Sequence, residues 1–121
     1  MAKIMVVEDD KQASTFLAEL LTSEGYVPIV VNESAKAVAM ADATLPDAFL
    51  VDLMMPEPDG FKLCRLLRAT SNFKKTPIII VTALDDTDSR IVAFGAGAND
   101  YLVKPFHIAD LSAKLKALLV R

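Results

Sequence analysis

Five short, unbroken runs of apolar residues recur along the chain, and the segments between them carry apolar residues at helical spacing. The runs cover residues 4–7, 29–31, 49–51, 78–81 and 101–103. Most are rich in β-branched residues, and continuous apolar runs of this length are typical of strands buried on both faces of a parallel sheet. The pattern therefore predicts five buried strands separated by helices.

Five helices are predicted from apolar residues that share one helical face. These residues are Phe16, Leu17, Leu20 and Leu21; Ala35, Val38, Ala39 and Met40; Phe61, Leu63, Leu66 and Leu67; Ile91, Val92 and Phe94; and Ile108, Leu111, Leu115, Leu118 and Leu119. Gly25 suits the position after the first helix, and Asp85 or Asp86 is expected to cap the fourth. Strands that alternate with helices predict an α/β domain over residues 1–121. We expect a flavodoxin-like (βα)5 fold, with a five-stranded parallel sheet in the order 2-1-3-4-5 and helices on both faces.

The composition narrows the class of protein. The chain has 121 residues, a net charge of −3 and an apolar fraction of 53%. This length fits one domain with a real core, and the acidic charge argues against direct binding to nucleic acid or to an anionic membrane. The single cysteine, Cys64, allows no internal disulfide, which suits a reducing cytosol. No apolar stretch is long enough to span a bilayer, so we expect a cytoplasmic protein.

Charged or hydroxyl-bearing residues directly follow or end four of the five predicted strands. Glu8 and Asp9 follow the first strand, Asp52 the third, Thr82 the fourth and Lys104 the fifth. In the predicted order these strands are neighbours, and open α/β sheets bind ligands at the carboxyl ends of their strands. Asp9, Asp52, Thr82 and Lys104 are therefore expected to meet in one crevice. The second strand, which ends at Asn32, should lie at the edge, away from them.

The chemistry of such a crevice indicates phosphoryl transfer. Several carboxylates repel one another unless a cation lies between them, and Mg²⁺ takes carboxylate and water oxygens as ligands. A lysine and a threonine hydroxyl would then hold a phosphoryl group on Asp52. Taken singly, the residues have ordinary explanations: Asp10, Asp59 and Asp85 suit helix caps or turns. The combination of Asp9, Asp52, Thr82 and Lys104 in one crevice favours a phosphorylation site.

Four motifs stand in a fixed order along the chain. They are IMVVEDD at residues 4–10, DLMMP at 52–56 followed by Asp59-Gly60, VTA at 81–83, and GANDYLVKPF at 97–106. Each is weakly specific alone, but in this order and at this spacing they are a strong signal. The sequence resembles the receiver domains of response regulators, the CheY-like family of two-component phosphorelay systems, over essentially its full length.

The resemblance implies a phosphoacceptor and a metal site. Asp52 would accept a phosphoryl group from a sensor histidine kinase or a histidine phosphotransfer protein. Asp9 would ligate Mg²⁺ directly and Glu8 mainly through water, with Asp52 and the backbone carbonyl of Met54 completing the protein ligands. Mn²⁺ would serve as a substitute for Mg²⁺.

The resemblance also implies the response to phosphorylation. Thr82, Ala83 and Lys104 would contact the phosphoryl oxygens, and Tyr101 would turn inward as Thr82 is drawn toward the phosphate. The surface of the fourth helix, fifth strand and fifth helix would then change shape, and Lys104-Pro105 would be a cis peptide. Such a domain is a signalling switch and not an enzyme, since it catalyses only its own phosphorylation and dephosphorylation.

Two side chains predict how long the phosphoryl group lasts. Met54 and Leu84 stand two residues after Asp52 and Thr82, at positions that border the attacking water in this family. Both are apolar and cannot orient water by hydrogen bonding. We therefore expect a long-lived phosphoryl group, with Glu57 as the polar residue that could approach the same region.

The output of the switch is left open by the sequence. The chain could act alone, control an effector domain or bind a downstream protein. A phosphorylation-dependent homodimer through the fourth helix, fifth strand and fifth helix is another alternative, with Asp100, Asp110 and Lys114 as pairing residues. Val92 and Asn99 stand where this kind of dimer would have charge, which argues against it.

Three rival functions also remain open. A degenerate receiver would only bind proteins. The intact acidic pair, Asp52, Thr82 and Lys104 argue against it. A small phosphatase with an aspartyl nucleophile would place two aspartates two residues apart after the first strand, which this chain does not do. A flavin-binding module would offer hydroxyls in its first loop, where this chain has Glu8, Asp9 and Asp10.

Overall fold

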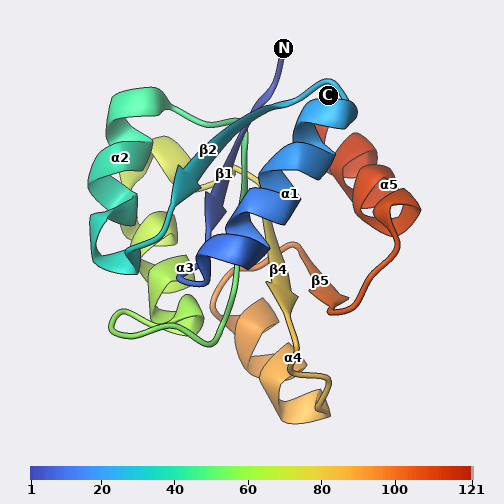
Figure 1. The fold of residues 1–121 in the computed structure, drawn as a ribbon. Helices are drawn as coiled ribbons and strands as arrows, with labels where there is room; N and C mark the ends of the chain where they lie inside the picture. The colour runs from blue at the N-terminus through green and yellow to red at the C-terminus, as the bar shows by residue number, and fades with distance from the viewer. Residues whose placement is uncertain (121) are drawn as a thin grey trace.

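The computed structural model describes residues 1–120, which form a central sheet flanked by helices (Figure 1). The elements are β1 (Lys3–Val7), α1 (Lys11–Ser23), β2 (Val27–Val31), a 3₁₀ turn (Ser34–Lys36), α2 (Ala37–Thr44), β3 (Ala48–Val51), α3 (Gly60–Ala69), a second 3₁₀ turn (Ser71–Phe73), β4 (Ile78–Thr82), α4 (Thr87–Gly95), β5 (Asp100–Val103) and α5 (Ile108–Leu119). The predicted alternation of strands and helices is confirmed.

The sheet has the strand order β2-β1-β3-β4-β5, and every neighbouring pair is parallel. The predicted flavodoxin-like order is therefore confirmed. The central strands β3 and β4 are buried along their whole length, as their unbroken apolar sequences require. At the edge, β2 contains Pro28, which has no N–H group to donate to a neighbouring strand and is therefore tolerated in an edge strand.

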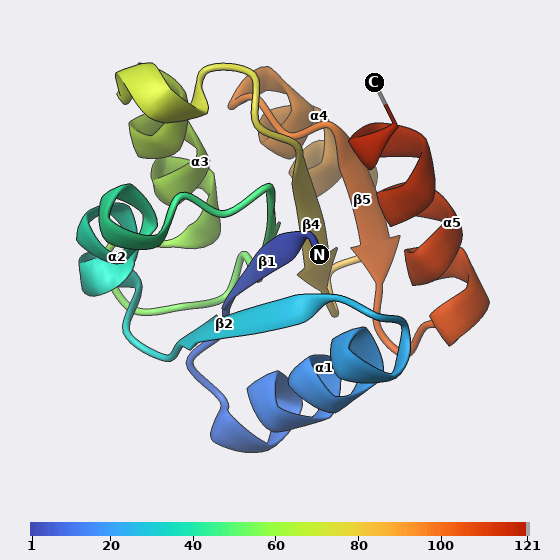
Figure 2. The ribbon, with the colours of Figure 1, turned by 90° about the horizontal axis from the view of Figure 1, so that it is seen from above.

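The helices form two layers, one on each face of the sheet. Figure 2 shows α1 and α5 on one face and α2, α3 and α4 on the other. Successive residues of β1 point to opposite faces: Ile4 and Val6 join the core under α1 and α5, and Met5 and Val7 join the core under the other three helices. Both faces of the central strands β1, β3 and β4 are therefore buried, and the loops at the strand ends are left for polar residues.

Short polar caps fix where the helices start and stop. Asp10, Asp59 and Asp86 each accept hydrogen bonds from backbone N–H groups in the first turns of α1, α3 and α4. Of the two candidates for the fourth cap, Asp86 is the one that acts. After α1, Gly25 has a φ of 89°, a left-handed conformation that glycine adopts without steric cost, as predicted from its position.

The predicted packing faces of α4 and α1 are partly wrong. Ile91 is 63% exposed, Val92 and Phe94 are each 46% exposed, and the buried residue of α4 is Ala93. Phe16 of α1 is likewise exposed, at 58%. An alanine lets α4 lie close to the sheet, so its larger apolar side chains point outward and form an apolar stripe on the surface.

The buried face of α2 also differs from the prediction. Ala39 and Met40 are exposed, and Ala37 and Ala41 are fully buried. The 3₁₀ turn over Ser34–Lys36 delays the start of the α-helix, which changes the face that meets the sheet.

In the part of the chain that the structure describes, no helix has both the length and the apolarity needed to cross a bilayer.

Candidate functional site

The carboxyl ends of β1, β3, β4 and β5 bring three charged side chains together. The Nζ atom of Lys104 lies 2.5 Å from Oε1 of Glu8 and 3.2 Å from Oδ2 of Asp52. Glu8 and Asp52 are both buried, and Thr82, at the end of β4, is fully buried. Of the four residues predicted to converge, Asp52, Thr82 and Lys104 meet at this edge of the sheet, together with Glu8. The fourth, Asp9, is exposed.

The backbone hydrogen bonds of the sheet continue past the strand ends and hold these residues in place. The N–H of Glu8 donates to the carbonyl of Val31 and that of Asp52 to the carbonyl of Val7, both at 3.1 Å. The N–H of Lys104 donates to the carbonyl of Thr82 at 2.8 Å. The side chains therefore project from a rigid scaffold and not from mobile loops.

Glu8 and Asp52 share the ammonium group of Lys104, but their pKa values shift in opposite directions. Burial raises the pKa of Glu8 to about 7, although its hydrogen bond to Lys104 opposes the shift. Burial alone would raise the pKa of Asp52 too, but its hydrogen bond from the N–H of Met54 and the adjacent groups lower it on balance. Asp52 is therefore held as an ionised carboxylate.

Lys104 stays protonated between these carboxylates. Burial alone would lower its pKa, but the hydrogen bond to Glu8 and the charge of Asp52 raise it.

The structure also has the predicted cis peptide at Lys104-Pro105, and a second one at Glu57-Pro58 that was not predicted.

Asp9 lies apart from the buried carboxylates. It is exposed and lines a cavity of about 220 Å³ together with Asn32, Glu33 and Glu57. Over residues 1–120 no three histidine, cysteine, aspartate or glutamate side chains are grouped closely enough to hold a metal ion. The metal site predicted from Glu8, Asp9, Asp52 and Met54 therefore remains a prediction.

The residues around Asp52 leave its outer side open. Ala83 is exposed and small, and the side chain of Met54 is 59% exposed. The hydroxyl of Thr82 accepts a hydrogen bond from the N–H of Leu84 at 3.4 Å. A ligand that offers strong acceptor oxygens could therefore accept a hydrogen bond from this hydroxyl.

The ring of Tyr101 lies inside the domain. It is 4% exposed, and its hydroxyl donates a hydrogen bond to the carbonyl of Leu84 at 2.8 Å. Because Leu84 also contacts the hydroxyl of Thr82 through its N–H, the β4–α4 loop connects the two side chains that were predicted to form the switch.

Two supporting residues were missed in the sequence. The side-chain amide of Asn32 donates to the carbonyl of Glu8 at 2.8 Å, so the edge strand β2 is not isolated from the site. A Cβ atom on Gly60 would lie 2.3 Å from the carbonyl oxygen of Asp52. The Asp-Gly motif was the available signal for Gly60. Asn32 was expected to lie away from the site, and its hydrogen bond to Glu8 corrects that expectation.

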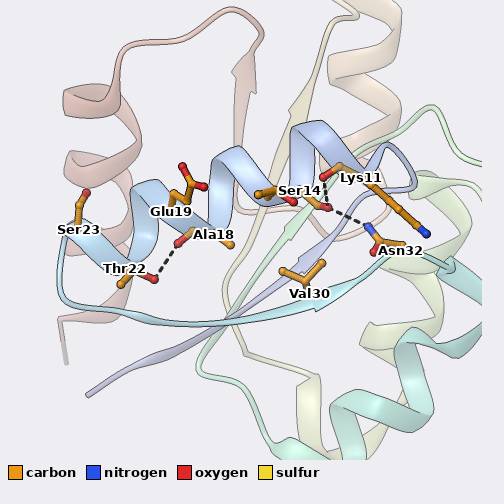
Figure 3. Close-up of a pocket in the computed structure, with 9 residues that line it drawn as sticks. Lys11, Ser14, Ala18, Glu19, Thr22, Ser23, Val30 and Asn32 are labelled. Atoms are coloured by element: carbon orange, nitrogen blue, oxygen red, sulfur yellow. Dashed lines mark hydrogen bonds between the residues drawn. The ribbon is translucent and has the colours of Figure 1, made fainter.

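A groove of about 580 Å³ between α1 and β2 lies outside this cluster (Figure 3). Several of its polar groups are engaged within the protein: Asn32 donates to the hydroxyl of Ser14 at 2.9 Å, and the hydroxyl of Thr22 donates to the carbonyl of Ala18 at 2.9 Å. We therefore assign the functional site to the charged cluster and not to this groove.

Comparison with known proteins decides the family. The family model for the response regulator receiver domain matches residues 4–116. The chain belongs to this family. Receiver domains of response regulators are signalling switches of two-component systems, and phosphorylation and Mg²⁺ binding are typical of them.

Individual relatives agree with this assignment. The receiver domain is 39% identical over 119 residues to the response regulator MprA of Mycobacterium ulcerans, covering 98% of this chain and 50% of that protein. It superposes on the BeF3-activated N-terminal receiver domain of RstA from Klebsiella pneumoniae with a TM-score of 0.92 and 34% identity, covering 98% and 99% of the two chains. The chain spans about half the length of the curated relatives it matches.

A third comparison concerns a metal. The receiver domain of a sensor histidine kinase from Pseudomonas aeruginosa PAO1, whose structure has a magnesium ion coordinated in the active site cleft, superposes with a TM-score of 0.90 and 36% identity. The two chains are covered to 98% and 97%. Mg²⁺ binding is thus documented for a protein of the same fold and family.

Proposed function

We propose that residues 1–121 act as a phosphorylation switch in the cytoplasm, in which Asp52 accepts a phosphoryl group from a sensor histidine kinase or a histidine phosphotransfer protein. The observation that carries the proposal is the buried Asp52 carboxylate paired with Lys104 at 3.2 Å beside Thr82. An ionised carboxylate on a rigid strand end is a suitable nucleophile for phosphorus.

The proposed transfer is a single displacement at phosphorus. One carboxylate oxygen of Asp52 forms a bond to the phosphorus of a phosphohistidine, the phosphorus–nitrogen bond breaks, and the leaving imidazole takes up a proton. The product carries about −1.5 to −2 charges on the phosphoryl group. The ammonium of Lys104, the hydroxyl of Thr82 and the exposed N–H side of Ala83 are the groups of this chain that would face the phosphoryl oxygens.

The oxygen-rich donor set fits Mg²⁺. Glu8 and Asp52 are two buried carboxylates that share one ammonium, so negative charge remains to be offset, and hard cations prefer oxygen ligands. Asp9 is exposed, so its side chain can turn toward them without disturbing the core, and Met54 would add its carbonyl. Bound Mg²⁺, or Mn²⁺ in its place, would offset the charge of the phosphoryl group.

The proposed output passes through Thr82 and Tyr101. Movement of Thr82 toward the phosphate would act on the β4–α4 loop and so on the surface of α4, β5 and α5. The exposed apolar stripe of α4 supports this surface as the contact for an effector domain, a downstream protein or a second copy of the chain. Against a dimer held by charge, Asp100 already pairs with Lys114 inside the chain, at 3.0 Å.

The proposal is tested by mass spectrometry of the intact protein after incubation with acetyl phosphate. With Mg²⁺ the wild type should gain one phosphoryl group; with EDTA it should gain none, and Asp52→Asn should gain none in either condition. The loss is complete because an amide is not a nucleophile here. A folded wild type without an adduct from acetyl phosphate or from a phosphorylated histidine donor would favour the degenerate receiver. Steady turnover of a phosphate ester would favour the phosphatase.

A second expected result concerns the lifetime of the phosphoryl group. We expect it to persist for minutes to hours, because the apolar Met54 and Leu84 cannot orient a water and Glu57 is engaged with Lys62 at 3.3 Å. Met54→Asn should shorten this lifetime severalfold, since an amide can position water and the side chain is exposed. Loss of the adduct is followed by mass spectrometry after removal of the donor.

Met40→Asn on α2 is the matched control, since it makes the same change at another exposed methionine. It should leave the lifetime unchanged. A wild-type lifetime of seconds, or equal lifetimes for Met54→Asn and wild type, would contradict the role assigned to the apolar side chains.

A further inference from the structure

The ring of Tyr101 is covered by two side chains from the same face of α4. The guanidinium carbon of Arg90 lies 4.7 Å from the centre of the ring, within the range of a cation–π contact. The ring of Phe94, one helical turn further on, is 6.5 Å away and tilted by 39°. Both side chains therefore lie beside the Tyr101 ring.

Arg90 is itself fixed by the loop that follows Thr82. One terminal nitrogen of its guanidinium lies 3.0 Å from a carboxylate oxygen of Asp85. Asp85 is not needed as a helix cap, since Asp86 performs that role. The same loop accepts the Tyr101 hydroxyl at the carbonyl of Leu84, so it contacts Tyr101 at its hydroxyl and, through Arg90, at its face.

We propose that Arg90, braced by Asp85, is a positioning residue that holds the ring of Tyr101 in its buried position. The inference rests on the proposed function for its consequence, since that function makes Tyr101 the switch aromatic. Outward rotation of the ring removes the contact with Arg90 and the hydrogen bond to Leu84 together. The two contacts therefore favour the same rotamer from two sides.

The consequence for signalling follows from linkage. A ligand shifts a conformational equilibrium by its differential affinity for the two states, and the relation is reciprocal. If the buried ring belongs to the phosphorylated state, then Arg90 raises the affinity of the site for a phosphoryl group or its mimic. An exposed cation–π contact of ordinary strength would change that affinity by about threefold.

The position of the ring can be measured without phosphorylation. The chain has no tryptophan and two tyrosines, so Tyr26→Phe leaves Tyr101 as the only fluorescent tyrosine. In that background Arg90→Gln should increase quenching of Tyr101 by acrylamide severalfold, and Asp85→Asn should increase it less. Arg90→Lys, which keeps the positive charge, should lie closer to the parent protein than to Arg90→Gln.

The matched control is Arg65→Gln, which removes an exposed arginine from α3 and should leave the quenching unchanged. Circular dichroism checks that each variant is folded. Unchanged quenching in folded Arg90→Gln would overturn the proposal, and so would Arg90→Lys behaving like Arg90→Gln.

Titration with beryllofluoride and Mg²⁺ tests the consequence separately. Arg90→Gln should bind the mimic about threefold more weakly than the parent, and Arg65→Gln should bind it equally well. Equal binding by Arg90→Gln and the parent would overturn the link to the switch. If the parent itself does not bind the mimic, the proposed function fails, whereas the quenching series still decides whether Arg90 holds the ring.

Discussion

Gly60→Ala is expected to destabilise the domain by about 3 kcal/mol, near the upper end of what overpacking costs. The added Cβ would lie 2.3 Å from the carbonyl oxygen of Asp52 and 2.6 Å from the Cα of Leu53. Both are backbone atoms, which cannot rotate away as a flexible side chain would. The N–H of Gly60 also donates to the carbonyl of Leu53 at 3.1 Å, so moving the helix away breaks a hydrogen bond.

The same substitution at Gly95 is the control for this prediction. Gly95 ends α4 and does not have a left-handed φ, and a Cβ added there would meet nothing within 4 Å. Gly95→Ala should therefore be neutral or stabilise by up to about 1 kcal/mol through helix propensity. Urea unfolding followed by circular dichroism measures both variants. If Gly60→Ala unfolds at the same urea concentration as Gly95→Ala, the close approach to Asp52 is not a constraint.

The clash at Gly60 would reach the proposed phosphorylation site directly. The atoms that would have to move belong to Asp52 and to the residue after it, and the Asp52 carboxylate is held by the N–H of Met54 at 3.1 Å. In any fraction of Gly60→Ala that remains folded, the yield of the phosphoryl adduct should fall as well. Gly95→Ala should keep the yield of the wild type.

The sequence predicts the sheet and the convergent site well because both depend on local patterns. Runs buried on both faces need a continuous apolar sequence, so the strands can be recognised. The strand order then brings Asp52, Thr82 and Lys104 together, whereas Glu8 takes the buried place that was expected for Asp9. Which face of each helix packs against the sheet is harder to predict from the sequence. Which apolar residue of α4 is buried depends on how closely that helix approaches the sheet, and this distance is set by Ala93 and not by the larger side chains.

Contacts between distant segments are the part that the sequence does not predict. Nothing in the spacing of Arg90 or Asn32 shows that one covers Tyr101 and the other reaches the backbone of Glu8. The pKa values of the site residues also depend on the folded structure. The residue types suggest a group of carboxylates, but burial decides that Glu8 has a pKa of about 7 while that of Asp52 is lowered.

Arg68 is the strongest case of such a contact, and Arg68→Ala is expected to cost about 3 kcal/mol of stability. Its guanidinium donates to the carbonyls of Phe73, Thr76 and Gly97 at 2.6–3.0 Å and to the side chain of Asn99 at 2.7 Å. These acceptors belong to the segment before β4 and to the α4–β5 turn. The substitution would leave several partly buried oxygens without their donors, which costs more than the loss of an exposed ion pair.

Shape as well as charge should matter at this position. The planar guanidinium reaches acceptors in several directions, which one ammonium group cannot do, so Arg68→Lys should recover less than half of the lost stability. Gly97 fits this arrangement, because its φ is 114° and a Cβ there would lie 2.6 Å from Cγ of Arg68. Arg65→Ala, on the exposed side of the same helix, should change stability by less than about 0.5 kcal/mol. Urea unfolding distinguishes the cases: if Arg68→Lys matches the wild type, a single positive charge is sufficient and the hydrogen-bonded network does not hold α3 to the α4–β5 turn.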